Sequence, residues 1–292
     1  MTAMGRSWHP EHFTCVSCRR SLEGQTFVPH EGRPYCQACY REQVSPKCSV
    51  CGQPLQGNYL EDYWGDRFCA RHRDELEKCS SCQRPVCDLL TGGGVRYRDG
   101  RSMCNLCRRT AVDQVAQGAR VAGVVRQALE GMGFGLGGLE IPLRLVGLRE
   151  LERVGRNPEG LNGKTKVLVR TMGKEEVSRK VEEILVLYGL PEEHHGVVLA
   201  HEYGHAWLFL QRFPPLSPQV EEGFCQLLSY QWLAQQGTPE AGFFMQLMRN
   251  SDDPVYGVGL RDALAGLGSR SVAQLAEYVR QDQRFPSIAS QR

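Results

Sequence analysis

The feature that most constrains this chain is the pairing of its cysteines. Twelve of the thirteen lie between Cys15 and Cys107, and most of them form Cys-x-x-Cys pairs. A short secreted protein would use so many cysteines for disulfides, whereas repeated pairs at regular spacing are typical of metal sites in a reducing compartment. The pattern therefore predicts metal-binding modules in the first third of a cytoplasmic protein.

Two such pairs joined by a hairpin supply the four tetrahedral ligands that a structural zinc site requires. Three complete sets can be counted, with seventeen, seventeen and twenty-one residues between their halves. The sets are Cys15, Cys18, Cys36 and Cys39; Cys48, Cys51, Cys69 and His72; and Cys79, Cys82, Cys104 and Cys107. Four protein ligands leave zinc no open position, so we expect these modules to bind proteins rather than to catalyse. Cys87 and Cys225 remain, and we expect them to be buried small residues.

The composition changes near residue 110, where cysteine almost disappears and helical periodicity begins. We expect a helix over Ala111–Glu130, a flexible joint over Gly131–Gly138, and a mostly helical domain with a small sheet after it. The expected strands are Ile141–Leu148 and Lys166–Arg170, and the expected long helices are about Glu175–Tyr188, Gly196–Gln211 and Pro218–Gln236.

Charge and hydropathy exclude several classes of function. The formal net charge is only +2, and no recognition-helix pattern joins the cysteine pairs, so nucleic acid is not an expected partner. No stretch approaches about 18 uncharged apolar residues, and the first ten residues hold no signal-peptide core. We therefore expect no membrane association.

The decisive stretch for chemistry is Val197–Leu208, which contains His-Glu-Tyr-Gly-His. On a helix, His201 and His205 share one face and can both point a ring nitrogen at one metal, with Glu202 beside the metal's water. Three protein ligands leave zinc a fourth position for water and lower the pKa of that water toward about 7, so Glu202 can act as general base. The pattern predicts a metallopeptidase centre.

A third ligand is expected sixteen or seventeen residues after His205. Ser217 and Pro218 begin a helix that carries Glu221 and Glu222 in its first turns. We favour Glu222 as the ligand and Glu221 as the partner that orients a ligand histidine, although the two could be exchanged. A donor should also stabilise the oxyanion that develops during hydrolysis, and Tyr256 and His195 are candidates.

Several segments together resemble the LIM-domain peptidases of plants that limit organ size, the "DA-one" family. They are Ile184–Pro191, Leu199–Glu202 with His205–Leu208, Val220–Gly223 with Cys225–Gln226, and Tyr256–Gly259. The likeness extends from about Trp8 to Pro286. It implies a ubiquitin-activated zinc peptidase of the gluzincin type that cuts selected proteins, with His201, His205 and Glu222 as ligands and Glu202 as base. Tyr203 and Gly204 replace a bulkier pair in that family.

The resemblance also suggests how the chain is divided. We expect a partial LIM domain over residues 1–44, a LIM-like zinc module over 45–110, a helix and glycine-rich linker over 111–139, and a gluzincin-like domain over 140–292. His9 and His12 match the second half of a preceding zinc site whose first half is missing. Either the start is truncated or misannotated, which we favour, or the site is vestigial and both histidines face solvent. In the plant enzymes ubiquitin-interacting helices precede the LIM domain, and we expect no counterpart of them before Trp8.

Two functions of different kinds follow. The first is an endopeptidase that cleaves protein substrates, with one catalytic and about three structural zinc ions, and with modules that recruit proteins or respond to ubiquitin. The second is a non-catalytic LIM adaptor that keeps an inactive peptidase scaffold. The retained Glu202 favours the first, because a scaffold without activity has no need of a general base.

Overall fold

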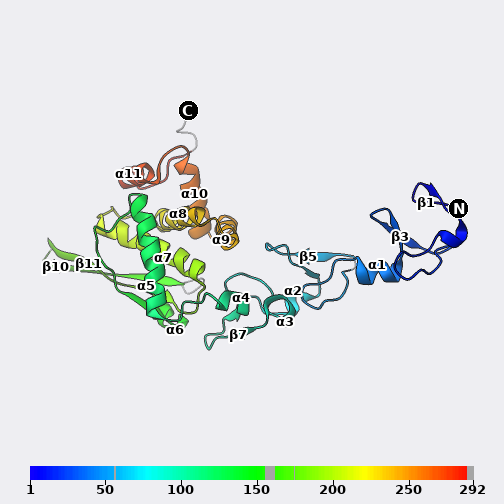
Figure 1. Cartoon of the computed structure of the whole chain (residues 1–292). Coiled ribbons are helices and arrows are strands. Elements are labelled where there is room, and N and C mark those ends of the chain that lie inside the picture. Colours follow the sequence, from blue (N-terminus) through cyan, green and yellow to red (C-terminus); the bar gives the residue numbers. More distant parts are fainter. Residues whose placement is uncertain (56, 155–161, 174, 288–292) are drawn as a thin grey trace. The chain divides into compact units, whose positions relative to one another are not determined.

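The computed structural model describes residues 1–55, 57–154, 162–173 and 175–287 (Figure 1). The chain divides into two compact units. The first consists of Met1–Cys79 with Gln83–Val95, and the second of Ser80–Cys82 with Arg96–Arg292. In the described part of the chain no helix is both long and apolar enough to cross a membrane.

The first unit is built from short hairpins and turns of helix. Its elements are β1 (Thr2–Ala3), β2 (Arg6–Ser7), η1 (Pro10–His12), β3 (Phe27–His30), β4 (Arg33–Cys36), α1 (Gln37–Gln43), β5 (Tyr59–Glu61), β6 (Arg67–Cys69), α2 (His72–Glu75) and α3 (Asp88–Thr91). Two small cores lie beside the cysteines, one around Phe13 and Leu22 and one around Leu55 and Phe68. Cores of this size rarely fold alone, so bound metal is expected to complete them.

A fourth two-stranded hairpin is formed by β7 (Gly94–Arg96), which crosses the boundary between the units, and β8 (Ser102–Cys104), and α4 (Asn105–Arg108) follows it. The remaining elements of the second unit are α5 (Val115–Gly131), β9 (Leu143–Val146), α6 (Leu148–Val154), β10 (Gly163–Met172), β11 (Glu175–Leu187), α7 (Glu192–Leu210), α8 (Pro218–Gln236), α9 (Pro239–Arg249), α10 (Tyr256–Leu267) and α11 (Val272–Asp282). The prediction of small cysteine modules followed by a mostly helical region is confirmed.

The sheet of the second unit has the order β10-β11-β9, with β10 antiparallel and β9 parallel to β11. In Figure 1 the β10–β11 hairpin extends away from the helices of this unit. The predicted strands over Ile141–Leu148 and Lys166–Arg170 contain β9 and part of β10. Glycines allow the helices to approach closely: Gly223 of α8 lies against the main chain of Gly259 of α10.

The predicted helix over Glu175–Tyr188 is wrong, because this segment is strand β11. Val177, Val181, Ile184 and Leu185 recur at helical spacing, which is why the sequence favoured a helix. In the structure β11 pairs with β10 along one edge and with β9 along the other. The four consecutive residues from Ile184 to Leu187 are all buried, so both faces of the strand are covered there and apolar and polar residues do not alternate. Pairing on both edges therefore outweighs the local periodicity.

The glycine-rich segment that follows α5 is anchored inside the second unit. Phe134 is 2% exposed, and its ring packs edge-on against Trp207 of α7 at 4.9 Å and against Phe224 of α8 at 5.9 Å. Gly133, with φ of +93°, makes the turn that returns the chain toward this core. The expected flexible joint is thus held at its centre by aromatic packing.

Candidate functional site

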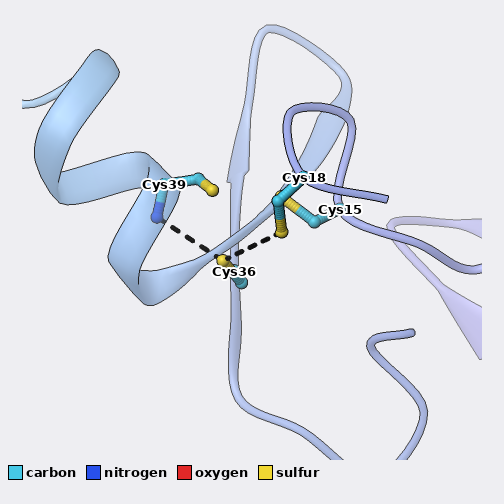
Figure 2. A group of neighbouring side chains, drawn as sticks. All are labelled: Cys15, Cys18, Cys36 and Cys39. Carbon is cyan, nitrogen blue, oxygen red and sulfur yellow. Dashed lines mark hydrogen bonds between the residues drawn. The ribbon is translucent and has the colours of Figure 1, made fainter. Parts of the chain in front are cut away.

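All three predicted cysteine sets are brought together. In each set one ligand atom per residue lies within 4.8 Å of the others. Figure 2 shows the first set, in which Cys15 and Cys18 come from a loop, Cys36 from the end of β4 and Cys39 from the first turn of α1. The sulfur atoms of Cys18 and Cys36 lie 3.8 Å apart.

Each set also contains a main-chain N–H that donates to a cysteine sulfur. The donors are Cys39 to Cys36 at 3.4 Å, Cys69 to Cys48 at 3.4 Å, and Cys107 to Cys104 at 3.5 Å. Burial raises the pKa of Cys48, but main-chain N–H groups lower it further, so that its pKa falls to about 7. In the same set burial and the neighbouring thiols raise the pKa of Cys69 to about 11, so the shared feature of the sets is their geometry. Four converging ligand atoms fit tetrahedral zinc, and these clusters support zinc binding.

A fourth group of converging ligands lies between α7 and α8. His201 Nε2 is 3.1 Å from His205 Nε2, and Glu222 Oε2 is 3.0 Å from the first nitrogen and 3.2 Å from the second. The spacing of four residues places both rings on one face of α7, as the sequence predicted. Ser217 begins α8 by capping the N–H of Val220, and Glu222 follows in the next turn.

The charges of this group fit a cation at its centre. Burial opposes ionisation of Glu222, but His201 and His205 outweigh it and lower the pKa of its carboxyl. Two imidazole nitrogens and one carboxylate oxygen point their lone pairs at one another. Such an arrangement is stabilised by a proton or a metal ion between these atoms. Glu221 Oε1 lies 3.1 Å from His205 Nδ1, on the outer side of that ring. The geometry thus places Glu222 inward and Glu221 behind a histidine, the arrangement we favoured.

Glu202 is 5% exposed and is held by the edge strand β10. The Thr165 hydroxyl is within donating distance of Glu202 Oε2, at 2.7 Å, and of the main-chain oxygen of the same residue, at 2.8 Å. A Cβ atom at Gly163 would lie only 2.9 Å from Glu202 Oε1. Sequence reasoning missed Thr165 and Gly163, since nothing in the sequence predicts that β10 runs beside α7.

A cavity of about 350 Å³ opens onto these residues. Its lining includes His201, Glu202, His205 and Glu222, together with apolar side chains of α7 and α9 and polar groups from 162–164 and 251–256. Tyr256, at the start of α10, lies on the wall with its ring 6.1 Å from that of His201. Burial raises the pKa of Tyr256 to about 12, so its hydroxyl stays protonated as a donor.

His195, the other candidate for the oxyanion donor, points elsewhere. It is fully buried, does not line the cavity, and has Nε2 3.3 Å from the place where a Cβ would stand on Gly118 of α5. Neither ring nitrogen has a hydrogen-bond partner among the described residues. Burial lowers the pKa of His195 to about 4. His195 is therefore a neutral core residue between α5 and α7.

The residues left outside the four groups behave differently from ligands. Cys225 is fully buried beside Gly204, and burial raises the pKa of its thiol to about 11. Cys87 is half-buried at the start of α3. His9 and His12 are exposed, with ring centres 5.4 Å apart, and they belong to none of the four ligand groups found in the described part of the chain.

Comparison with known proteins finds two matching domain families and several relatives. The model of the family "DA1-like: Protein DA1" matches residues 143–241, and that of "LIM: LIM domain" matches residues 1–44. Protein DA1-related 2 of Arabidopsis thaliana is 33% identical over 274 residues, which are 80% of this chain and 50% of that protein.

Two further relatives are similar over almost the whole chain. LIM domain-containing protein HDR3 of Oryza sativa subsp. japonica is 27% identical over 98% of this chain and 71% of its own length. Protein DA1 of Arabidopsis thaliana is 28% identical over 98% of this chain and 65% of its own length. The chain thus spans between half and about seven tenths of the relatives it matches. The chain thus carries a LIM domain at one end and a DA1-like domain after it, an arrangement consistent with the DA1 proteins that it resembles.

Proposed function

We propose that this chain is a zinc-dependent endopeptidase with a gluzincin-like catalytic domain. The observation that carries the proposal is the convergence of His201, His205 and Glu222 on one point at the floor of a cavity, with Glu202 beside them. A site with three protein ligands keeps a position open for water, whereas each cysteine set supplies four ligands. Among the four ligand groups found in the described residues, the histidine–glutamate group is therefore the one that suits catalysis.

Each residue of the site has a distinct part in the proposed reaction. Zinc held by His201, His205 and Glu222 would supply a Lewis acid that activates water and polarises the scissile carbonyl. Glu202 accepts a proton from the attacking water and delivers it to the leaving amine. The Thr165 hydroxyl holds the Glu202 carboxylate through its 2.7 Å bond to Oε2. The hydroxyl of Tyr256 donates a hydrogen bond to the developing oxyanion.

The cavity suits an extended protein segment. β10 is one of the two edge strands of the described sheet, and Asn162 with the first two residues of β10, Gly163 and Lys164, lines the cavity beside Glu202. An extended peptide can add to such an edge through main-chain hydrogen bonds. Apolar side chains of α9, Phe244, Leu247 and Met248, offer a neighbouring surface for a substrate side chain. We therefore propose unfolded or extended regions of proteins as the substrates.

The cysteine modules of the first unit are proposed to recruit protein substrates or regulators. Closed four-ligand sites fold small surfaces and do no chemistry of their own. A response to ubiquitin, which the family resemblance implies, belongs to the same proposal. If the catalytic group held no metal, the molecule would be the LIM adaptor that is the alternative.

The test is cleavage of an unfolded protein such as reduced casein by the wild type and by Glu202→Gln, before and after ubiquitination of the chain. Loss of the general base is expected to lower cleavage about 10³- to 10⁴-fold, because amide cannot accept the proton. The zinc content of both forms is measured alongside and should be equal. Equal cleavage by both forms, or no cleavage by zinc-loaded wild type under either condition, contradicts the proposal.

A further inference from the structure

The third cysteine set differs from the other two in what lies between its ligands. Ser81 stands inside the pair Cys79-Ser-Ser-Cys82 and belongs to the second compact unit. Its side chain is 2% exposed, and its hydroxyl oxygen lies 3.0 Å from Nδ1 of His194 in the first turn of α7. A hydrogen bond thus joins a residue of a metal-binding loop to the helix that carries His201.

His194 faces the proposed catalytic cavity. It precedes His201 by seven residues, which is two helical turns or about 10 Å along the axis, and therefore shares its face. His194 lines the cavity, and its ring packs against that of Phe244 with centres 4.7 Å apart. Its Nε2 lies 3.5 Å from Nδ2 of Asn162, which also lines the cavity.

These contacts specify which nitrogen of His194 carries the proton. The amide nitrogen of Asn162 can only donate, so Nε2 must accept and the proton must be on Nδ1. The Nδ1–H then donates to the Ser81 hydroxyl oxygen. At 3.5 Å the hydrogen bond from Asn162 to Nε2 is long and therefore weak. An N–H of a molecule in the cavity can replace it as the donor to Nε2.

Main-chain bonds hold the same junction from a second side. The N–H of Gly189 donates to Val112 O at 2.9 Å, the N–H of Val112 donates to Leu190 O at 2.8 Å, and that of Glu192 to Thr110 O at 3.0 Å. The segment that follows the third cysteine set is therefore paired with the segment that leads into α7. Ser81 meets a helix whose start is already fixed, so its bond can orient the His194 ring without moving the helix.

We propose that His194 binds the substrate by accepting a hydrogen bond from one of its N–H groups, and that Ser81 is the residue that positions the ring for this. The inference rests on the peptidase function proposed above and adds a contact two turns of helix away from the reacting atoms. Ser81 lies between two ligands of the third set, so that set is joined to the cavity through the Ser81–His194 hydrogen bond, although none of its own residues lines the cavity.

The test is the binding of a fluorescent peptide that the wild type cleaves, measured on the inactive Glu202→Gln chain so that no turnover is needed. Adding Ser81→Ala should weaken binding about fivefold, the effect of losing one neutral hydrogen bond. Ser80→Ala is the matched control, since it also removes a serine hydroxyl from the same loop. None of the hydrogen bonds described involves the Ser80 hydroxyl. It should leave affinity unchanged.

A double-mutant cycle separates positioning from general loosening. His194→Ala should weaken binding at least as much as Ser81→Ala, and the two changes together should weaken it no further than His194→Ala alone. In the active chain, Ser81→Ala should raise KM about fivefold with kcat within about twofold. Zinc content and melting temperature should match those of Ser80→Ala.

Additive effects of Ser81→Ala and His194→Ala, an unchanged affinity, or a loss of zinc on Ser81→Ala would each overturn the inference.

The failure of the proposed function would look different. In that case neither the wild type nor any variant would cleave, and no cleaved peptide could be chosen for the binding assay. The ¹⁵N shifts of the His194 ring would then still test its bond to Ser81, since Ser81→Ala should change the Nδ1–H tautomer population while Ser80→Ala should not.

Discussion

The cysteine sets and the histidine–glutamate group are two kinds of candidate metal site built in different ways. Each cysteine set draws its ligands from one short stretch, and nearby main-chain N–H groups complete it. The histidine–glutamate group draws its residues from α7 and α8, the neighbouring Glu202 is held by β10, and a wall of the cavity comes from α10. The first kind depends on local turns, and the second depends on the packing of a whole domain.

The largest effect expected from the cavity wall is that of Tyr256→Phe. Loss of an oxyanion donor should lower kcat about 10²-fold, while zinc content stays unchanged because Tyr256 is not a ligand. Cleavage rates at saturating substrate measure the effect. Tyr230→Phe on α8 makes the same change outside the cavity and should leave kcat unaltered. Equal rates for wild type and Tyr256→Phe would assign the oxyanion to another donor.

Acid should weaken the packing of α5 on α7 through His195. Its pKa in the folded chain is about 4, below the ordinary 6.5, so the unfolded chain binds the proton first as pH falls. The contribution to stability is complete above pH 6.5 and is lost progressively down to pH 4, by about 3 kcal/mol. His195→Leu should lack this part of the loss. The free energy of unfolding of wild type and of His195→Leu is measured by denaturant unfolding at both pH values. An identical loss of stability in the two proteins would refute the role given to His195.

A smaller effect is expected where α8 meets α10 beside the ligand Glu222. Gly223→Ala would place a Cβ 2.5 Å from the carbonyl carbon of Gly259, and main chain cannot turn aside as a side chain can. We expect a loss of about 2 kcal/mol in the free energy of unfolding and weaker zinc binding at this one site. Gly123→Ala, on an open face of α5, is the matched control and should not destabilise. Cysteine-bound zinc released by Gly223→Ala would break the contrast between the two kinds of site.

The same contrast explains what the sequence could predict. Cys-x-x-Cys pairs and the helical spacing of His201 and His205 are local signals, and the expected groupings are all present in the structure. The helix expected over Pro218–Gln236 is present with those bounds as α8, because the capping side chain of Ser217 and the left-handed Gly237 that follows Gln236 act within one turn. The roles of the grouped residues stay predictions until metal and activity are measured.

What the sequence missed depends on distant partners. β11 has the apolar spacing of a helix and becomes a strand because β10 and β9 pair with its two edges. Thr165 reaches Glu202 across thirty-seven residues, and Ser81 reaches His194 across 113. Contacts of such sequence separation leave no periodic trace in the chain. Only the packed structure brings them together.

The most direct test of the account is the zinc content of the purified chain, measured for the wild type and for His201→Ala/His205→Ala together with cleavage. Three closed cysteine sets and one open site predict about four zinc ions per wild-type chain, about three in the double variant, and no cleavage by the latter. Four zinc ions in both proteins, or three in both, would contradict the claim that the histidine–glutamate group is the catalytic metal site.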